Sequence, residues 1–297
     1  MTMSAIIQTI APTTHDLGDV KVRRAIPTRG RTVVGPFIFV DQFGPAQLDI
    51  GTGMDVRPHP HINLATVTWL FQGAIDHRDS IGSYATIRPG QVNLMTAGKG
   101  IVHSERSPGD ERAAGPQLYG MQTWLALPDG MEEIDPAFEA VKDLPMVEDQ
   151  CVKAHVIMGE LWGKRAPTTT YADTIYAEIL LGPSGAIPID ADAEERAVML
   201  VGGDASLDGE PLELYSLVVL KPGARMVLRS DSGGRAMLLG GEAFSTRRHV
   251  WWNFVSSSRE RIAQAKEDWT QGRFPRVPGD EKEWIPIPER PLTRSED

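Results

Sequence analysis

Three of the seven histidines belong to two pairs of potential metal ligands, and the members of each pair are two residues apart. His59-Pro60-His61 forms one such pair, and His103-Ser104-Glu105 forms the other. In a strand, residues i and i+2 point to the same side, so each pair can direct both side chains into the interior of a barrel. Three imidazoles and one carboxylate suit Fe, Cu, Ni, Mn, Co or Zn. The spacing therefore predicts one divalent transition-metal ion held by His59, His61, His103 and Glu105.

Neither pair is decisive by itself. A His-x-His pair is common on exposed strands, and His103-Ser104-Glu105 could form a solvated hydrogen-bonding patch. Their co-occurrence, together with the glycines around them, favours a shared metal site. A structural or surface role is expected for the other histidines, which are His15, His77, His155 and His249. His77-Arg78-Asp79 could lie near the mouth of the site, but no role is assigned to His77 or to Lys99.

The elements that must carry these ligands are expected to be short strands. Gly (29) and Pro (22) interrupt the chain every several residues, and most segments between them contain β-branched or aromatic residues. Over residues 64–71, Ala65, Val67 and Trp69 alternate with residues of the opposite face. Further strands are expected at Tyr84–Ile87, Gln91–Thr96, Met121–Leu127, Tyr176–Leu181, Ala197–Val201, Leu214–Leu220 and Arg235–Gly240.

The expected strands form two groups, at residues 30–127 and 170–245, which predicts a duplicated β-barrel. The segment between the groups is richer in acidic residues and Pro. We expect one barrel in residues 1–135 that binds the metal. The second, in residues 136–297, is expected to be metal-free, since no histidine lies between His155 and His249. It would bury apolar surface against the first barrel, or form part of a lid or partner-binding face.

A helix is expected near residues 257–271, followed by an extended proline-rich tail after Phe274. Ser257 and Glu260 have the spacing of a capping box at the start of the helix. Ile262, Ala265 and Trp269 would share its apolar face.

Length and charge limit the other functions that this chain can have. With 297 residues, the chain can build a core without a structural metal, so the metal is expected to be functional. Lys and Arg number 30 against 40 for Asp and Glu, and this net charge of −10 argues against direct nucleic-acid binding. The single cysteine, Cys151, is expected to be a buried bystander. No signal peptide or membrane span is recognisable, so a cytoplasmic protein is expected.

The glycines around the ligand pairs resemble the motifs of the cupins, which are small jelly-roll barrels. Gly53, His59, His61, Thr66 and Gly73 follow the spacing of the first cupin motif. Thr66 stands where the cupin motif usually has a glutamate, and Glu105 restores the ligand count. Gly100 precedes His103 as in the second motif, with Gly98 in place of the usual proline.

The ligand segments further resemble those of the pirin family, and residues 251–258 resemble a pirin-related bacterial branch. Pirins typically carry a His-Pro-His pair before a Thr-Val-Thr strand, then a His-Arg-Asp-Ser turn and a Met-Thr-Ala-Gly-x-Gly-Ile-x-His-Ser-Glu run. This sequence matches at residues 59–61, 66–68, 77–80 and 95–105. It departs after His61, where Ile62-Asn63-Leu64-Ala65 replaces Arg-Gly-Phe-Glu, and at Asn93-Leu94, where Gln-Trp is usual. These departures predict a different pocket shape.

The resemblance implies two cupin barrels and quercetin 2,3-dioxygenase activity on a flavonol or related phenolic, with O2 as the second substrate. In the mechanism it implies, Glu105 takes the proton of the 3-hydroxyl group, and the central ring is cleaved with loss of carbon monoxide. Fe(II) is the expected metal, and a monomer is expected.

Two alternatives are a non-catalytic metal-binding regulatory protein that acts by protein–protein contact, and a cupin isomerase that uses the metal as a Lewis acid. Oxygen consumption separates the dioxygenase from both.

Overall fold

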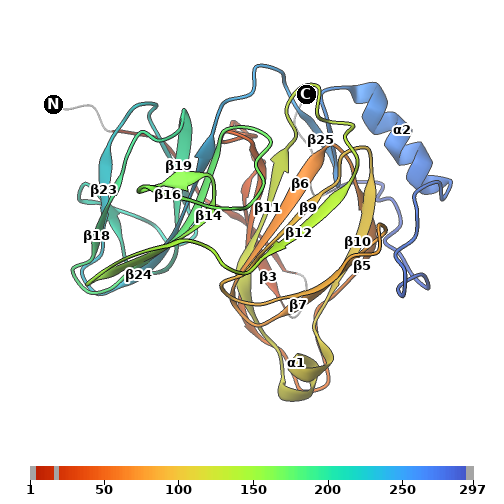
Figure 1. Cartoon of the computed structure of the whole chain (residues 1–297), viewed down its shortest axis with the longest axis horizontal. Coiled ribbons are helices and arrows are strands. Elements are labelled where there is room, and N and C mark those ends of the chain that lie inside the picture. The colour runs from red at the N-terminus through yellow and green to blue at the C-terminus, as the bar shows by residue number, and fades with distance from the viewer. Residues whose placement is uncertain (1–4, 17–19, 292–297) are drawn as a thin grey trace.

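The computed structural model describes residues 5–16 and 20–291 and contains two β-barrels side by side (Figure 1). In Figure 1, strands of the C-terminal half form the barrel on the left, and the N-terminal half forms the barrel on the right. This confirms the expected all-β class with two cupin-type barrels.

The N-terminal barrel consists of a seven-stranded and a four-stranded antiparallel sheet. The larger sheet has the order β12-β9-β6-β11-β4-β3-β2, and the smaller has the order β5-β10-β7-β8. The strands are β2 (Thr13–Asp16), β3 (Lys21–Ile26), β4 (Phe37–Gln47), β5 (Asp55–His61), β6 (Leu64–Gln72), β7 (Ile75–Asp79), β8 (Tyr84–Ile87), β9 (Val92–Thr96), β10 (Ile101–Arg106), β11 (Gln117–Ala126) and β12 (Ala137–Val141). A short helix that the sequence analysis missed, α1 (Gly109–Ala114), lies between β10 and β11.

The C-terminal barrel repeats this plan. Its larger sheet has the order β1-β22-β19-β24-β17-β14-β13, and its smaller sheet has the order β18-β23-β20-β21. The strands are β1 (Ile6–Ile10), β13 (Met146–Asp149), β14 (Val152–Met158), β17 (Thr174–Leu181), β18 (Ala186–Ile189), β19 (Glu195–Gly203), β20 (Ser206–Leu207), β21 (Glu210–Pro211), β22 (Leu217–Leu220), β23 (Met226–Arg229) and β24 (Gly234–Gly241), and β15 (Glu160–Leu161) pairs with β16 (Lys164–Arg165). Apolar side chains fill its interior, among them Ile179, Leu200 and Leu238.

The sheets do not follow the expected division of the chain at residue 135. Strand β1 pairs with β22 of the C-terminal barrel, with Ile6 opposite Leu220. Strand β12, which follows residue 135, pairs with β9 of the N-terminal barrel. Each exchanged strand covers a sheet edge that would otherwise expose unpaired backbone groups.

The larger sheets of the two barrels pack face to face and share one apolar core. On β6, Ala65, Val67 and Trp69 point into this shared core, together with Tyr176 and Met237 of the second barrel. Leu64, from the opposite face of β6, belongs to a different cluster inside the first barrel. The alternation predicted for residues 64–71 therefore occurs, but both faces of the strand are buried.

After the second barrel, the chain returns to the first and covers its smaller sheet. The hairpin of β25 (His249–Trp251) and β26 (Phe254–Ser256) leads into helix α2 (Arg259–Thr270). Figure 1 shows α2 at the outer edge of the N-terminal barrel, beside β5 and β10. Its Ile262 and Ala265 pack on Ile62, and Trp269 joins the same cluster.

The helix cap lies one residue later than expected. The Oγ atom of Ser258 accepts from the backbone N–H of Arg261 and donates to Glu260. Ser257 instead donates to the carboxylate of Glu132. The chain from 275 to 291 has no regular secondary structure, as expected for a proline-rich tail.

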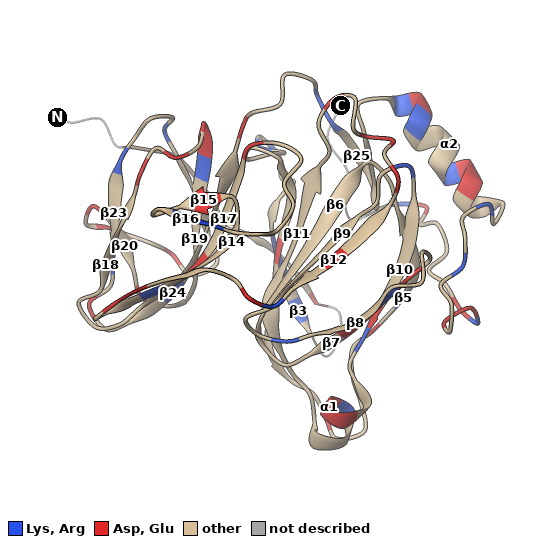
Figure 2. Cartoon of the chain, viewed as in Figure 1, with Lys and Arg blue, Asp and Glu red and all other residues tan. Residues whose placement is uncertain are grey.

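Cys151 is exposed, contrary to the expectation of a buried thiol, because it lies in the turn between β13 and β14. Acidic and basic residues are mixed along α2 and in the loops (Figure 2). Within the described ranges, no helix combines the length and apolar character that a membrane span requires.

Candidate metal centre

The four-stranded sheet positions all the residues of the predicted metal site. Central strand β10 pairs with β5 on one side and with β7 on the other. His103 on β10 lies directly opposite His59 on β5. Because His61 follows two residues after His59, all three side chains point to the same face of the sheet, which is the barrel interior.

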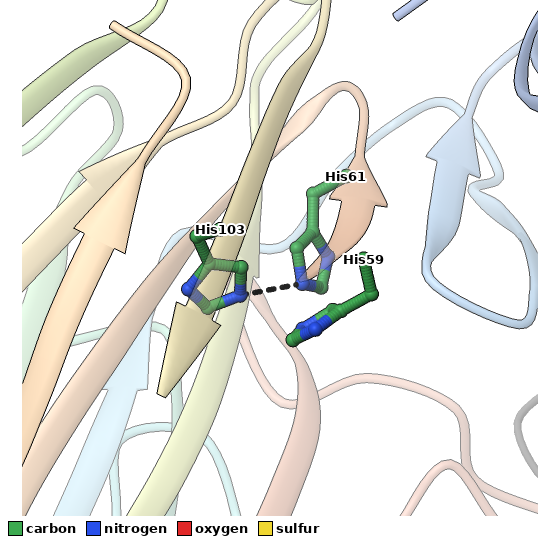
Figure 3. Close-up of side chains that lie close together, drawn as sticks. All are labelled: His59, His61 and His103. Atoms are coloured by element: carbon green, nitrogen blue, oxygen red, sulfur yellow. Dashed lines mark hydrogen bonds between the residues drawn. The ribbon is translucent and has the colours of Figure 1, made fainter. Parts of the chain in front are cut away.

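The three imidazoles meet in the interior of the barrel (Figure 3). One ligand nitrogen from each of His59, His61 and His103 lies within 4.8 Å of the others, and all three residues are buried. The Nε2 atoms of His61 and His103 are 3.1 Å apart. Buried nitrogens that converge in this way can be satisfied together by one bound cation, so the residues present fit a divalent transition metal.

In two of these rings, the Nδ1 atom has a polar partner outside the group of three histidines. Nδ1 of His59 lies 2.9 Å from the backbone carbonyl oxygen of Arg57, to which it can donate. Nδ1 of His103 lies 3.4 Å from Nδ1 of His77. Such contacts fix the tautomer that leaves Nε2 free for a metal.

Burial keeps the imidazoles neutral. It lowers the pKa of His59 to about 4, with the carbonyl of Arg57 opposing the shift and His77 adding to it. Burial also lowers the pKa of His61 and of His103 well below 6.5, reinforced by the neighbouring histidines. Only a neutral imidazole has the lone pair that a metal requires, so these rings are ready to bind at neutral pH.

Glu105 lines the same cavity but stands apart from the three imidazoles. Among the described residues, the group whose ligand atoms lie within 4.8 Å of one another contains the three histidines and not Glu105. Burial raises the pKa of the Glu105 carboxyl group, against the opposing effects of His77 and the Thr68 hydroxyl. The structure thus brings together three of the four predicted ligands and places the fourth on the adjacent wall.

The imidazoles open onto a cavity of about 320 Å³ between the two sheets of the N-terminal barrel. Its walls are mainly apolar and include Val22, Phe39, Phe43, Met54 and Trp124. Asp41 and Gln122 add polar groups. Phe39 and Trp124 stack with their ring centroids 3.9 Å apart, and the guanidinium of Arg24 lies over the Phe39 ring.

Sequence reasoning gave His77 and Asp79 no role, yet both lie directly behind the site. They occupy β7, where Asp79 is opposite His103 and His77 is opposite Glu105. Their two-residue spacing, the same as in the two ligand pairs, was a signal that could have found them. Lys99 instead pairs with Asp135 at the surface. His155 bonds to Glu178 at the junction of the barrels.

Comparison with known proteins connects this geometry to a family. The pirin family model matches residues 19–125, and the model of the pirin C-terminal cupin domain matches residues 176–275. A pirin-like protein of Caulobacter vibrioides is 44% identical over 279 residues, which are 92% of this chain and 96% of the relative. The chain belongs to the pirin family.

Solved structures also resemble this pirin. Quercetin 2,3-dioxygenase from Acinetobacter baumannii is 34% identical, with a TM-score of 0.90 and 98% of each chain covered. The Escherichia coli pirin YhhW, solved in complex with nickel(II), has a TM-score of 0.63 over 80% of this chain and 99% of its own. At 16% identity, the second match shows the fold alone.

The positions that depart from the usual pirin sequence lie outside the cavity lining. None of the described residues from Ile62 to Ala65, nor Asn93 or Leu94, lines the cavity. Ile62 packs under the C-terminal hairpin and α2, and the side-chain amide of Asn63 donates to Glu133 and to the backbone of Glu132. These substitutions therefore lie outside the cavity lining, and they give no support to the expected difference in pocket shape.

The lowered pKa of His59 predicts a specific pH dependence of stability. Between about pH 6.5 and 4, the unfolded chain binds a proton at His59 that the folded chain does not. The associated stability is present above pH 6.5 and lost as pH falls toward 4, by about 3 kcal/mol for this group. Urea unfolding of the metal-free protein should show this loss, and H59Q should show a correspondingly shallower pH dependence. Equal slopes in the two proteins would contradict the burial argument.

The same shift changes the expected pH dependence of metal binding. From the reference pKa of His alone, protons would compete with the metal as pH falls through about 6.5. In the folded protein, the lowered pKa values move this competition to more acidic pH.

Proposed function

We propose that this pirin is a metal-dependent dioxygenase of the quercetin 2,3-dioxygenase type, which cleaves a flavonol or related phenolic with O2. The observation that supports this most is the position of three buried imidazoles on the wall of a largely apolar cavity. The relation to the Acinetobacter baumannii enzyme, over nearly all of both chains, supports the same activity.

The cavity has the properties of a site for a flat, mostly apolar molecule. Its volume of about 320 Å³ is within the usual range for small-molecule sites. Phe39 and Trp124 contribute aromatic side chains to the lining, and Trp124 also contacts the ring of His61 edge-on at 5.1 Å between centroids. A phenolic ring system beside Trp124 would have its edge near the imidazoles.

We propose that His59, His61 and His103 hold the metal, with Glu105 as a fourth ligand. Fe(II) is our first candidate, and Cu, Ni, Mn, Co and Zn can also bind imidazole and carboxylate ligands. When bound, the metal would act as a Lewis acid toward the phenolic oxygen, and a redox-active metal would also mediate electron transfer to O2.

The protein groups supply position and a proton acceptor. Burial raises the pKa of Glu105, which brings its basicity closer to that of a phenol. A carboxylate on the cavity wall can accept the proton of the substrate hydroxyl group as that oxygen approaches the imidazoles. The apolar walls exclude water from the deprotonated substrate.

An oxygen-electrode assay tests the activity. Protein freed of metal and reloaded separately with iron, copper, nickel, manganese or cobalt should consume O2 with a flavonol in at least one form. The metal-free protein should be inactive. Loaded H155Q, altered at the junction of the barrels, should match the wild type. If no loaded form consumed O2 with any flavonol or simpler phenol, the regulatory alternative would replace this proposal.

A further inference from the structure

A third polar pair lies behind the imidazoles, on strand β7. His77 and Asp79 are 2% and 1% exposed, so neither can exchange its hydrogen bonds with water. Both point to the same face of the sheet as His103, because Asp79 is the cross-strand partner of His103 and His77 is two residues away. Buried ionisable groups of this kind require an explanation.

The pair forms a chain of hydrogen bonds that ends on a proposed metal ligand. His77 Nε2 lies 3.1 Å from Asp79 Oδ2, and His77 Nδ1 lies 3.4 Å from His103 Nδ1. The other carboxylate oxygen of Asp79 accepts from the backbone N–H groups of Ile81 and Ser83. Two backbone donors therefore hold this carboxylate in place beside His77.

These contacts determine where the protons of both rings lie. A carboxylate only accepts, so Nε2 of His77 carries a hydrogen, and in the neutral ring Nδ1 of His77 then has a lone pair. That lone pair can accept from Nδ1–H of His103, which leaves Nε2 of His103 unprotonated and facing Nε2 of His61. His77 also stacks on Phe138, with centroids 4.5 Å apart and planes 14° apart, so the ring orientation is held.

We propose that Asp79 and His77 are positioning residues that set the tautomer of His103 and prepare its Nε2 for the metal. This inference rests on the metal site of the proposed function. Partners of this kind orient ligating histidines and increase their basicity, and replacing them commonly weakens metal affinity by about tenfold to a hundredfold.

The variant D79N tests the tautomer with almost no change in shape. The backbone N–H groups of Ile81 and Ser83 should donate to the amide oxygen of the new Asn side chain. Its NH2 group would then face His77. His77 would then carry its hydrogen on Nδ1 and present a donor to Nδ1–H of His103, which would break the chain. Zinc affinity, measured by competition with a chromophoric chelator, should fall by about tenfold to a hundredfold.

The matched control is D76N, on the same strand. Asp76 accepts from Tyr84 and Thr86, two hydroxyl groups outside the site, and its variant should bind zinc within about twofold of the wild type. A second test variant, H77F, keeps an aromatic ring against Phe138 but removes both nitrogens. It should lose as much zinc affinity as D79N, and adding D79N to H77F should cause no further loss.

Long-range 1H–15N correlation spectra of the imidazoles, which distinguish protonated from unprotonated ring nitrogens, test the inference without any variant. In metal-free wild type, the hydrogens should lie on Nε2 of His77 and Nδ1 of His103. The opposite tautomer of either ring, or unchanged zinc affinity in D79N, would overturn the inference. If the wild type bound no zinc while the spectra showed the expected tautomers, the metal site would fail and the tautomer assignment would stand.

Discussion

Replacing Glu105 with glutamine should lower turnover per bound metal by about a hundredfold to ten-thousandfold, the usual contribution of a general base. Glutamine keeps an oxygen of similar reach but loses the charge and nearly all the basicity. Three imidazoles remain in E105Q, so the variant should still hold a metal, with weaker affinity. The loss of activity should therefore greatly exceed the loss of metal.

The measurement is O2 consumption under metal-saturating conditions, divided by the metal content of the same sample. E111Q is a suitable control, because Glu111 lies on α1, outside the cavity lining, and pairs with Arg88. It should retain wild-type turnover. If E105Q also cleaved a flavonol at the wild-type rate per metal, Glu105 would be at most a ligand and the proton would have another acceptor.

Replacing His61 or His103 with alanine should weaken metal binding by more than a hundredfold. This exceeds the about tenfold to hundredfold loss typical of groups that only orient a ligand. Each substitution removes one of three converging nitrogens and leaves two imidazoles, which coordinate a divalent metal poorly. Equilibrium titration with zinc or nickel measures the change.

Two controls separate lost coordination from lost folding. H155Q alters a histidine bonded to Glu178 at the junction of the barrels and should bind metal like the wild type. Urea unfolding of metal-free H61A and H103A should show that each variant folds before it is titrated. Wild-type affinity in a folded H103A would rule out His103 as a ligand.

The shared orientation of the histidines was predictable because strand geometry is local. Two-residue spacing places His59 and His61 on one face of a strand, and the same rule applies from His103 to Glu105. The sequence could not show how far Glu105 lies from the imidazoles. The pairing of β10 with β5 shifts register between His103 and Glu105. His103 lies opposite His59, but Glu105 lies opposite Val56.

Other features were missed because they depend on which strands become neighbours. The two-residue spacing of His77 and Asp79 indicates that they share one face of a strand, but they reach His103 because β7 pairs with β10, and local sequence does not specify this pairing. The exchange of β1 and β12 between barrels is similarly non-local. Ser257 and Ser258 are equally good helix caps by composition, and Glu132, 125 residues away in sequence, binds Ser257 and leaves Ser258 to cap α2.

X-ray absorption spectroscopy combined with elemental analysis, on protein purified without chelators and then saturated with one metal, tests the metal centre most directly. The structure predicts one metal ion per chain, with a scattering pattern of three imidazoles at about 2.1 Å and one further oxygen shell. The ion should be absent from a variant in which His59, His61 and His103 are all replaced. Two ions per chain, a coordination shell without imidazoles, or full occupancy in the triple variant would contradict the account.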